Sequence, residues 1–167
     1  MADELNQLAQ QVGAALKTHG MLLATAESCT GGWVGEIVTS VAGSSQWYDR
    51  GFITYTNESK QEMLGVSAST LAEFGAVSEQ TVREMAAGAL KHSRAHITLA
   101  ISGIAGPGGA TPGKPVGTVC MAWEVRNGGD QSKTFHFEGD RTEVRRQAVV
   151  AALREVIQIV KGETVTA

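Results

Sequence analysis

Two adjacent residues early in the chain, Ser28 and Cys29, are of the types that act as nucleophiles in acyl-transfer enzymes. They lie in Thr25–Gly32, Thr-Ala-Glu-Ser-Cys-Thr-Gly-Gly, between the apolar run Met21–Ala24 and the amphipathic segment Trp33–Val41. This order is typical of a strand, a tight turn and a helix. The first backbone N–H groups of a helix have no partner within it, so they can stabilise a developing oxyanion.

Small residues complete this turn. Gly31 and Gly32 allow a substrate to approach the backbone closely, and the N–H groups near Thr30 face the same region. A simpler interpretation is that Ser28 or Thr30 only caps the following helix, which is the usual role of such residues there. Taken alone, the stretch favours this simpler interpretation.

A tyrosine and a lysine follow the next extended run. Tyr55 lies near the end of Gly51–Thr56, and Lys60 falls about one turn into the helix expected after it. A lysine whose pKa is lowered by burial can take a proton from a serine hydroxyl, and a tyrosine can relay or orient that proton. Ser, Tyr and Lys together can therefore perform nucleophilic acyl chemistry without a catalytic histidine. For an arbitrary pair at this spacing, a core tyrosine and a solvated lysine is the commoner arrangement.

Two further segments carry groups that suit an anion. The glycine-rich loop Ser102–Pro115 can present several backbone N–H groups, and Ser102 and Gly106 are its candidate binding residues. Arg141 and Arg145 are four residues apart beside the N-terminus of a predicted helix, a combination that suits a phosphate. A surface lid and a solvated helix face explain the same two segments equally well.

The composition is that of an ordinary globular protein. The 167 residues are 43% hydrophobic and 19% charged, which suits one domain, 1–167, with a full core. No apolar run approaches the roughly 20 residues of a membrane helix, and the N-terminus lacks the pattern of a secretion signal. We therefore expect a cytoplasmic protein in which Cys29 and Cys120 are free thiols.

Charge and histidine spacing exclude two further classes. The formal net charge of −3 argues against a nucleic-acid binder that works by general phosphate neutralisation. The four histidines have no ligand-like spacing with each other or with the cysteines. We therefore predict no metal and no cofactor.

Helical and extended patterns alternate along the chain before a hairpin and a long final helix. Helices are predicted over Asp3–Thr18, Trp33–Val41, Glu58–Leu64, Ser67–Phe74, Ser78–Lys91 and Arg141–Val160. Strands are predicted over Met21–Ala24, Gly51–Thr56, His96–Ser102, Val116–Val125 and Ser132–Phe137. Asn57 and Asp140 are expected to cap the helices that follow them. This order predicts an α/β fold, a three-layer α/β/α sandwich with a mixed sheet of about five strands, and ligands bind such sheets at the strand ends.

Six short segments, taken in order, resemble the motifs of the CinA C-terminal domain family. They are Thr-Ala-Glu-Ser-Cys-Thr-Gly-Gly, Tyr-Thr-Asn-Glu-Ser-Lys, Gly-Ala-Val-Ser-Glu, Ser-Gly-Ile-Ala-Gly-Pro, Lys-Pro-Val-Gly-Thr-Val and Gly-Asp-Arg-Thr-Glu-Val-Arg-Arg. The match extends from about Leu5 to Val160. The resemblance implies an α/β/α sandwich and a homo-oligomer, a dimer or larger. It also implies hydrolysis of the carboxamide of nicotinamide mononucleotide to nicotinate mononucleotide and ammonia.

The same resemblance implies roles for individual residues. Ser28 is the expected nucleophile, and Tyr55 and Lys60 are its activating partners. Ser102 stands where relatives often have Thr, a change that keeps a hydroxyl. The expected substrate-binding residues are Thr30, Gly31, Gly32, Ser102 and Gly106, with Arg141 or Arg145 for the phosphate.

Three alternatives stay open. Cys29 is a rival nucleophile, because a thiol is intrinsically the better one at neutral pH. A non-catalytic module could use the same loops to sense a pyridine nucleotide. The historical name of the family points to a competence or DNA-damage role, although the acidic charge argues against direct DNA binding.

Overall fold

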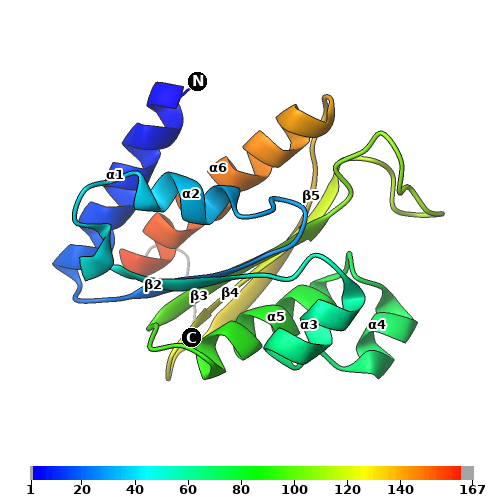
Figure 1. The fold of residues 1–167 in the computed structure, drawn as a ribbon, viewed down its shortest axis with the longest axis horizontal. Helices are drawn as coiled ribbons and strands as arrows, with labels where there is room; N and C mark the ends of the chain where they lie inside the picture. Colours follow the sequence, from blue (N-terminus) through cyan, green and yellow to red (C-terminus); the bar gives the residue numbers. More distant parts are fainter. Residues whose placement is uncertain (1, 163–167) are drawn as a thin grey trace.

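The computed structural model describes residues 2–162 and contains a five-stranded sheet (Figure 1). Its strands are β1 (Leu23–Glu27), β2 (Tyr48–Ile53), β3 (Ile97–Gly103), β4 (Thr118–Val125) and β5 (Asp130–His136). They are ordered β2-β1-β3-β4-β5. β1 pairs in parallel with β2 and β3, whereas β4 is antiparallel to both of its neighbours. The predicted mixed sheet of five strands is confirmed.

Helices cover both faces of this sheet (Figure 1). One face carries α1 (Ala2–Thr18), α2 (Trp33–Thr39) and α6 (Arg141–Val160). The other face carries α3 (Asn57–Leu64), α4 (Ala68–Phe74) and α5 (Glu79–Lys91). A short 3-10 helix, η1 (Ser44–Gln46), precedes β2. The predicted three-layer sandwich is therefore also confirmed.

The two helical layers pack through separate hydrophobic clusters. Successive side chains of a strand point to opposite faces, so Leu99 and Ile101 of β3 join the cluster with α1, α2 and α6. Ala100 joins the cluster with α3, α4 and α5. Helices pack closely in this second layer, since a Cβ on Gly88 of α5 would collide with the Leu64 carbonyl at the end of α3. This contact positions α3, the helix that carries the predicted base.

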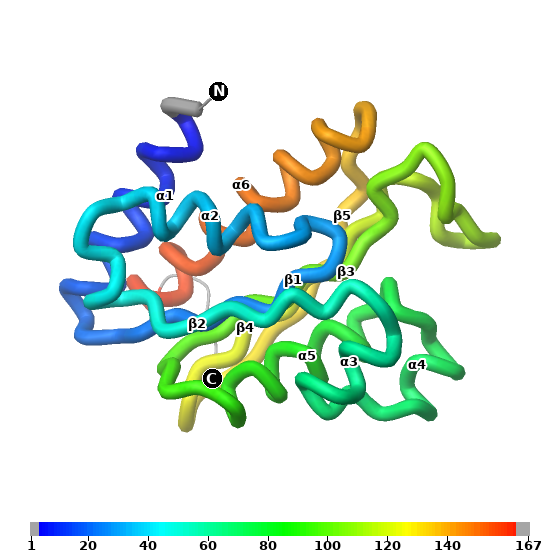
Figure 2. The backbone as a smooth tube through the Cα atoms, viewed as in Figure 1, coloured from blue at the N-terminus to red at the C-terminus, as the bar shows by residue number. Residues whose placement is uncertain are grey.

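The chain changes direction across the sheet at β1. It passes from β1 through α2 to β2 on one side, and later through α3, α4 and α5 to β3 on the other side (Figure 2). A crevice forms at the carboxyl ends of the strands where an α/β sheet reverses in this way. Ser28 directly follows β1, Thr54 directly follows β2, and Ser102 is the penultimate residue of β3. The topology thus brings the ends of three strands to one edge.

The first strand is displaced relative to the prediction, because it extends from Leu23 to Glu27 rather than from Met21 to Ala24. An end at Ala24 follows from the polar Thr25 and Glu27, which interrupt the apolar run. In the structure Thr25 and Glu27 belong to β1 and pair with both neighbouring strands. Both residues are buried, and the polar side-chain atoms of both form hydrogen bonds. The Thr25 hydroxyl lies 2.8 Å from the Tyr48 hydroxyl. A central strand tolerates such residues when their polar atoms have partners.

The cap of α3 also differs from the prediction. Asn57 is the first helical residue, and Thr56 is the N-cap. Thr56 Oγ1 accepts from the Ser59 N–H at 3.1 Å, and Ser59 Oγ accepts from the Thr56 N–H at 3.0 Å. Serine at the third helical position thus completes a capping box in place of the usual glutamate. The predicted cap of α6 is confirmed, because Asp140 Oδ1 accepts from the Glu143 N–H at 2.9 Å.

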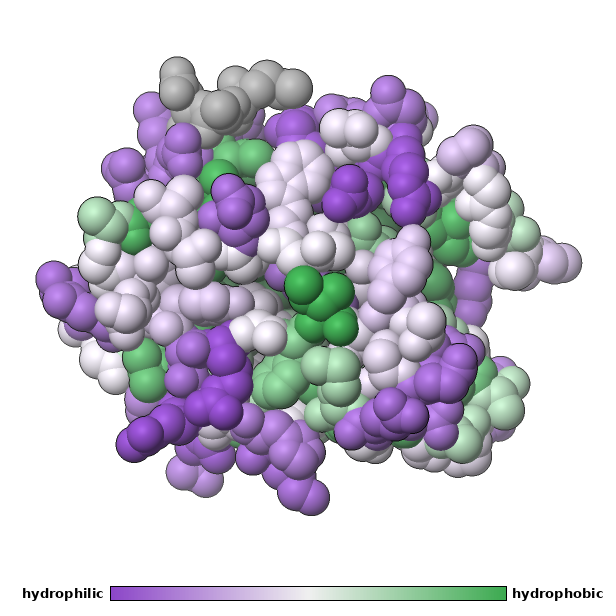
Figure 3. Space-filling view, viewed as in Figure 1, coloured by the Kyte–Doolittle hydropathy of each residue, from purple (hydrophilic) through white to green (hydrophobic). Residues whose placement is uncertain are grey.

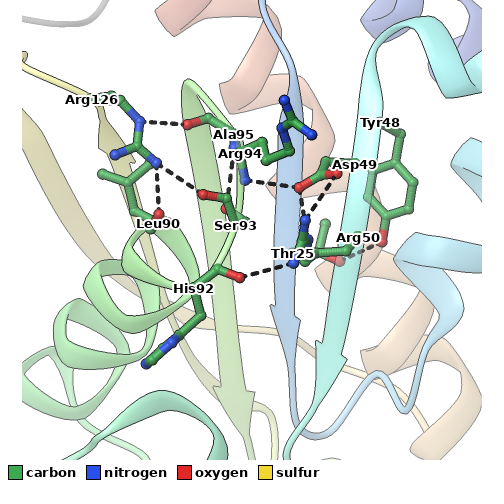
Figure 4. Close-up of polar contacts among 10 residues, drawn as sticks. All are labelled: Thr25, Tyr48, Asp49, Arg50, Leu90, His92, Ser93, Arg94, Ala95 and Arg126. Atoms are coloured by element: carbon green, nitrogen blue, oxygen red, sulfur yellow. Dashed lines mark hydrogen bonds and ion pairs between the residues drawn. The ribbon is translucent and has the colours of Figure 1, made fainter.

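A polar network joins the amino ends of β2 and β3 to the end of α5 (Figure 4). Asp49 accepts hydrogen bonds from Arg50 Nε at 2.8 Å and from the Arg94 N–H at 2.9 Å. Arg126 donates to the Leu90 carbonyl at 2.7 Å, and its charge suits the C-terminus of a helix. This network lies at the end of the strands opposite the predicted nucleophile. Its contacts indicate a structural role.

The surface is mostly hydrophilic on the face shown in Figure 3, around an apolar area near its centre. Large hydrophobic side chains are exposed at Ile53, Tyr55, Met63 and Phe74. Two of these four lie at the carboxyl end of β2, beside the candidate site. Within residues 2–162, no helix has the length and apolar character needed to cross a bilayer.

Candidate active site

The predicted nucleophile and the predicted base are in contact. Ser28 directly follows β1, and Lys60 lies in the first turn of α3, 32 residues further along the chain. The distance from Lys60 Nζ to Ser28 Oγ is 3.0 Å. A base can take a proton from a hydroxyl over such a distance. The fold therefore brings a primary amine next to a serine hydroxyl.

The surroundings of Lys60 favour its neutral form. The side chain is only 1% exposed, and no carboxylate in the described part of the chain forms an ion pair with it. Burial lowers the pKa of Lys60 below the usual value of 10.5, because the ammonium form loses its hydration. At neutral pH, the neutral form that can accept a proton is therefore more populated for Lys60 than for an exposed lysine.

Two backbone carbonyls orient the amine. Lys60 Nζ donates to the Thr54 carbonyl at 2.8 Å and to the Tyr55 carbonyl at 3.3 Å. A neutral amine has two N–H bonds and one lone pair. When the carbonyls take the two N–H bonds, the lone pair is left for the hydroxyl of Ser28. The contacts thus suit general-base catalysis as well as an ammonium that donates three hydrogen bonds.

The neighbouring thiol lacks these features. Cys29 is buried, and burial raises the pKa of its thiol to about 11. The charge of Arg145 and the backbone N–H of Cys29 both lower the pKa of the thiol, but by less than burial raises it. Since the thiolate is the reactive form, Cys29 is held in its less reactive state at neutral pH. The geometry favours Ser28 over Cys29.

The glycines of the turn have a conformational role. Gly31 and Gly32 have φ values of 60° and 103°, in the left-handed region that favours glycine. A Cβ on Gly32 would also lie 2.9 Å from Ile53 Cδ1. Neither glycine lines the cavity described below. Their presence is explained by the turn itself, rather than by close approach of a substrate.

Some of the backbone N–H groups around the start of α2 already have partners. The N–H groups of Val34 and Gly35 both donate to the Glu27 carboxylate at 3.0 Å, and the Gly31 N–H donates to the Ser28 carbonyl at 3.0 Å. The Cys29 N–H, in contrast, has no oxygen acceptor among residues 2–162. Of the predicted donors near Thr30–Gly32, the Gly31 N–H is therefore engaged. The N–H groups of Thr30 and Gly32, like that of Cys29, have no acceptor among residues 2–162.

A cavity of about 290 Å³ opens beside the Ser28 hydroxyl. Its walls come from the nucleophile turn, the segment after β2, α3, the α4–α5 connection, the end of β3 with the loop after it, and the start of α6. Of the predicted site residues, it is lined by Ser28, Tyr55, Lys60, Ser102, Gly106 and Arg141. The sequence therefore identified residues that meet at one cavity from five separate segments.

Arg141 and Tyr55 form one side of this cavity. Arg141 donates to the Gly106 carbonyl at 2.7 Å and to the Tyr55 hydroxyl at 3.2 Å. Both partners are uncharged, and no acidic group between residues 2 and 162 forms an ion pair with Arg141. The Tyr55 side chain is 60% exposed, and only its backbone carbonyl contacts Lys60. The hydroxyl is therefore not positioned as a proton relay between Ser28 and Lys60.

Arg145 and Thr30 lie behind the nucleophile turn and do not line the cavity. Arg145 donates to the carbonyls of Cys29 and Thr30 at 3.0 and 3.2 Å, and its guanidinium lies 5.5 Å from the centre of the Trp33 ring. Thr30 is buried and donates to Glu27 at 2.6 Å. These contacts stabilise the turn, so Arg141 is the better placed of the two arginines for a ligand.

Sequence reasoning missed Glu27 and the Thr54 carbonyl. An acidic residue at the end of an otherwise buried strand was a usable signal for Glu27, because such a carboxylate needs partners. The role of the Thr54 carbonyl has no sequence signal, because every residue has a backbone carbonyl. In the described range, no group of three or more His, Cys, Asp and Glu side chains is arranged to hold a metal.

The sequence matches a known family. Residues 5–160 match the CinA C-terminal domain, and the chain belongs to this family. It is 54% identical to the nicotinamide-nucleotide amidohydrolase PncC of Escherichia coli strain K12 over 155 residues, 93% of this chain and 94% of the relative. It is 44% identical to the PncC of Pseudomonas putida, with 94% of this chain and 98% of the relative covered.

Solved structures have the same fold. The competence/damage inducible protein CihA from Agrobacterium tumefaciens aligns with a TM-score of 0.90 at 45% identity, over 94% of this chain and 95% of that one. A CinA superfamily protein from Klebsiella pneumoniae aligns with a TM-score of 0.91 at 39% identity, over 95% and 98%. The sandwich architecture is thus that of the family.

Proposed function

We propose that this protein hydrolyses the carboxamide of nicotinamide mononucleotide to nicotinate mononucleotide and ammonia. Relatives that are 44% and 54% identical, and matched over nearly their whole length, are named nicotinamide-nucleotide amidohydrolase. The observation that carries the proposal is the 3.0 Å contact between Ser28 Oγ and the buried Lys60 amine. A serine amidase without a catalytic histidine can use such a lysine to activate its nucleophile.

In the first half of the proposed reaction, neutral Lys60 removes the proton of Ser28, and Ser28 Oγ attacks the carboxamide carbon. The resulting oxyanion is stabilised by the Cys29 N–H. The C–N bond then breaks, and Lys60 returns the proton to the departing nitrogen, which leaves as ammonia. The product of this half is a nicotinyl ester on Ser28.

In the second half, water takes the place of ammonia. Lys60 removes a proton from the water, and the hydroxide attacks the ester carbon. Collapse of the second tetrahedral intermediate breaks the bond to Ser28 Oγ, which regains its proton from Lys60. Nicotinate mononucleotide leaves, and the pair returns to its starting state.

Arg141 is the proposed phosphate ligand. It lies at the N-terminus of α6, lines the cavity, and has only uncharged partners. Ser102 and Gly106 line the same cavity and are proposed to contact the nucleotide. We assign Arg145, which holds the turn, to a structural role.

Replacement of Arg141 by methionine is expected to raise KM for nicotinamide mononucleotide by about 10- to 100-fold, the usual value of a charge-assisted contact. We expect kcat to change by less than about threefold, because the guanidinium does not touch the reacting carbon. Nicotinamide riboside, which has no phosphate, serves as the comparison and is expected to show no change in KM. The matched control is Arg83→Met on α5, an exposed arginine paired with Asp130. An equal loss with both substrates would contradict a phosphate role for Arg141.

The defining test of the function is ammonia release from nicotinamide mononucleotide by the purified protein with a chelator present. We expect ammonia and nicotinate mononucleotide in equal amounts. Tight binding of the nucleotide without ammonia release would instead identify a sensing module. Strong salt-dependent DNA binding by a protein without amidase activity would identify a competence-related role.

A cytoplasmic location and a homo-oligomer, both expected from the sequence, remain proposals.

A further inference from the structure

Glu27, the residue before Ser28, has a carboxylate buried in the interior. Its side chain is 2% exposed, and no lysine or arginine of the described segment forms an ion pair with it. An unpaired buried charge is costly unless hydrogen bonds compensate it. Three donors do so here: the Thr30 hydroxyl at 2.6 Å and the N–H groups of Val34 and Gly35 at 3.0 Å. The chain thus maintains a costly group immediately beside its nucleophile.

These three bonds connect the two ends of the nucleophile turn. Glu27 ends β1, and Val34 and Gly35 are in the first turn of α2, seven and eight residues further on. The N-cap residue of α2, Gly32, supplies no side-chain cap. Glu27 caps the helix in its place, from the preceding strand, and its charge suits the helix N-terminus. The turn that contains Ser28 is therefore closed by a side chain at its base.

The two members of the reacting pair are held by different side-chain and backbone contacts. Lys60 is oriented by the carbonyls of Thr54 and Tyr55, after β2. Ser28 is held by its own N–H, which donates to the Ile101 carbonyl of β3 at 3.0 Å, and by the closed turn that follows it. The side-chain contacts of Glu27 go to the turn and to α2, whereas its backbone carbonyl accepts from the Thr54 N–H at 2.8 Å, a contact that side-chain substitution leaves in place. We expect movement of α2 relative to β1 to displace the turn that holds Ser28 more than Lys60, because Lys60 is held from the segment after β2.

We propose that Glu27 is a positioning residue for the reaction, which closes the turn between β1 and α2 so that Ser28 Oγ meets Lys60 Nζ. The proposal rests on the proposed function, in which Ser28 is the nucleophile. It assigns Glu27 no contact with substrate and no proton transfer. Displacement of a reacting group by a fraction of an ångström to one ångström is sufficient to reduce a rate strongly.

The test uses Glu27→Gln in the full chain. Glutamine has nearly the same shape, but its NH₂ group must face one of the three donors, so at least one hydrogen bond is lost. We expect kcat for nicotinamide mononucleotide to fall by about 10- to 100-fold, with KM within about threefold of wild type. The second variant, Thr30→Val, keeps both bonds to the helix and loses only the hydroxyl. We expect its kcat to fall by about 3- to 10-fold, as for a single hydrogen bond.

A second readout separates positioning from stability. The rate at which a fluorophosphonate labels Ser28, measured by mass spectrometry below the melting temperature of every variant, reports on the nucleophile without the substrate. We expect the labelling rate to fall in parallel with kcat. The control is Ser67→Ala, which removes the N-cap of α4 and destabilises the protein away from the site. This control is expected to lower the melting temperature and leave both rates unchanged.

The outcomes distinguish this proposal from the proposed function. Labelling of wild type without ammonia release, with slower labelling of Glu27→Gln, would support positioning and reject the substrate. Equal labelling of wild type and Glu27→Gln would overturn positioning, whatever the amidase result. The same holds if wild type is not labelled at Ser28, since there is then no reactive serine to position. Should Glu27→Gln fail to fold, Thr30→Val decides the question by the same two rates.

Discussion

Replacing Ser28 by alanine is expected to lower kcat for ammonia release by about a thousandfold or more. The covalent route disappears with the hydroxyl. We expect the fold to be unaffected, because Ser28 is anchored through its backbone N–H to Ile101, which alanine retains. Circular dichroism and nucleotide binding are expected to match wild type.

The measurement pairs this variant with Cys29→Ala. Cys29 is adjacent in the chain, is also buried, and carries the rival nucleophile in a form that its pKa of about 11 keeps protonated. We expect its kcat to stay within about fivefold of wild type, a loss of the size that a small packing defect near the site produces. The reverse pattern, an active Ser28→Ala and an inactive Cys29→Ala, would transfer the nucleophile to the thiol.

Replacing Lys60 by methionine is the second large effect that we expect. The variant keeps an unbranched side chain that is one atom shorter but removes the amine, and a lost general base costs about 10²- to 10⁴-fold in kcat. KM is expected to change little, because Lys60 contacts Ser28 and two carbonyls rather than the substrate phosphate. The matched control is Lys91→Met, at the exposed end of α5.

The pH dependence of activity follows from the neutral form of the amine. Lys60 acts as a base only when unprotonated, so kcat/KM of wild type is expected to rise with pH through the folded-state pKa. Burial lowers this pKa, so the rise is expected at a pH below the usual 10.5. Activity independent of pH below 10 would count against Lys60 as the base.

The stability of Lys60→Met provides a second check on the lowered pKa of Lys60. Above a pH of about 10.5 the lysine is neutral in both states, and its burial carries no protonation penalty. As the pH falls from that value towards the lowered folded-state pKa, the unfolded chain binds a proton that the folded protein excludes, so stability decreases. Lys60→Met has no amine at this position, so its stability does not include this protonation penalty. We expect the variant to be at least as stable as wild type at neutral pH, and its advantage to shrink as the pH approaches 10.5 in urea titrations.

Much of the fold follows from local sequence patterns. The apolar stripes of α1, α5 and α6, the alternation in β3 and the Asp140 cap are periodicities and signals that short segments carry by themselves. They predict the sandwich, the mixed sheet and the segments that hold Ser28, Lys60 and Arg141. Local patterns determine the ends of helices and strands less well. In β1, the polar Thr25 and Glu27 belong to the strand because neighbouring strands and α2 supply their hydrogen-bond partners.

The roles of individual side chains depend on contacts between distant segments. The spacing of Tyr55 and Lys60 gives no information on which of them is buried, and the tertiary structure exposes the tyrosine and buries the lysine. The same is true of the two arginines of α6, of which one lines the cavity and the other holds the nucleophile turn. The element pattern and the candidate residues follow from the sequence, because periodicity and turn chemistry are local. The burial of Lys60 against Ser28, the arginine that lines the cavity and the closure of the turn by Glu27 follow from the tertiary structure, because burial and hydrogen-bond partners arise from packing across the sheet.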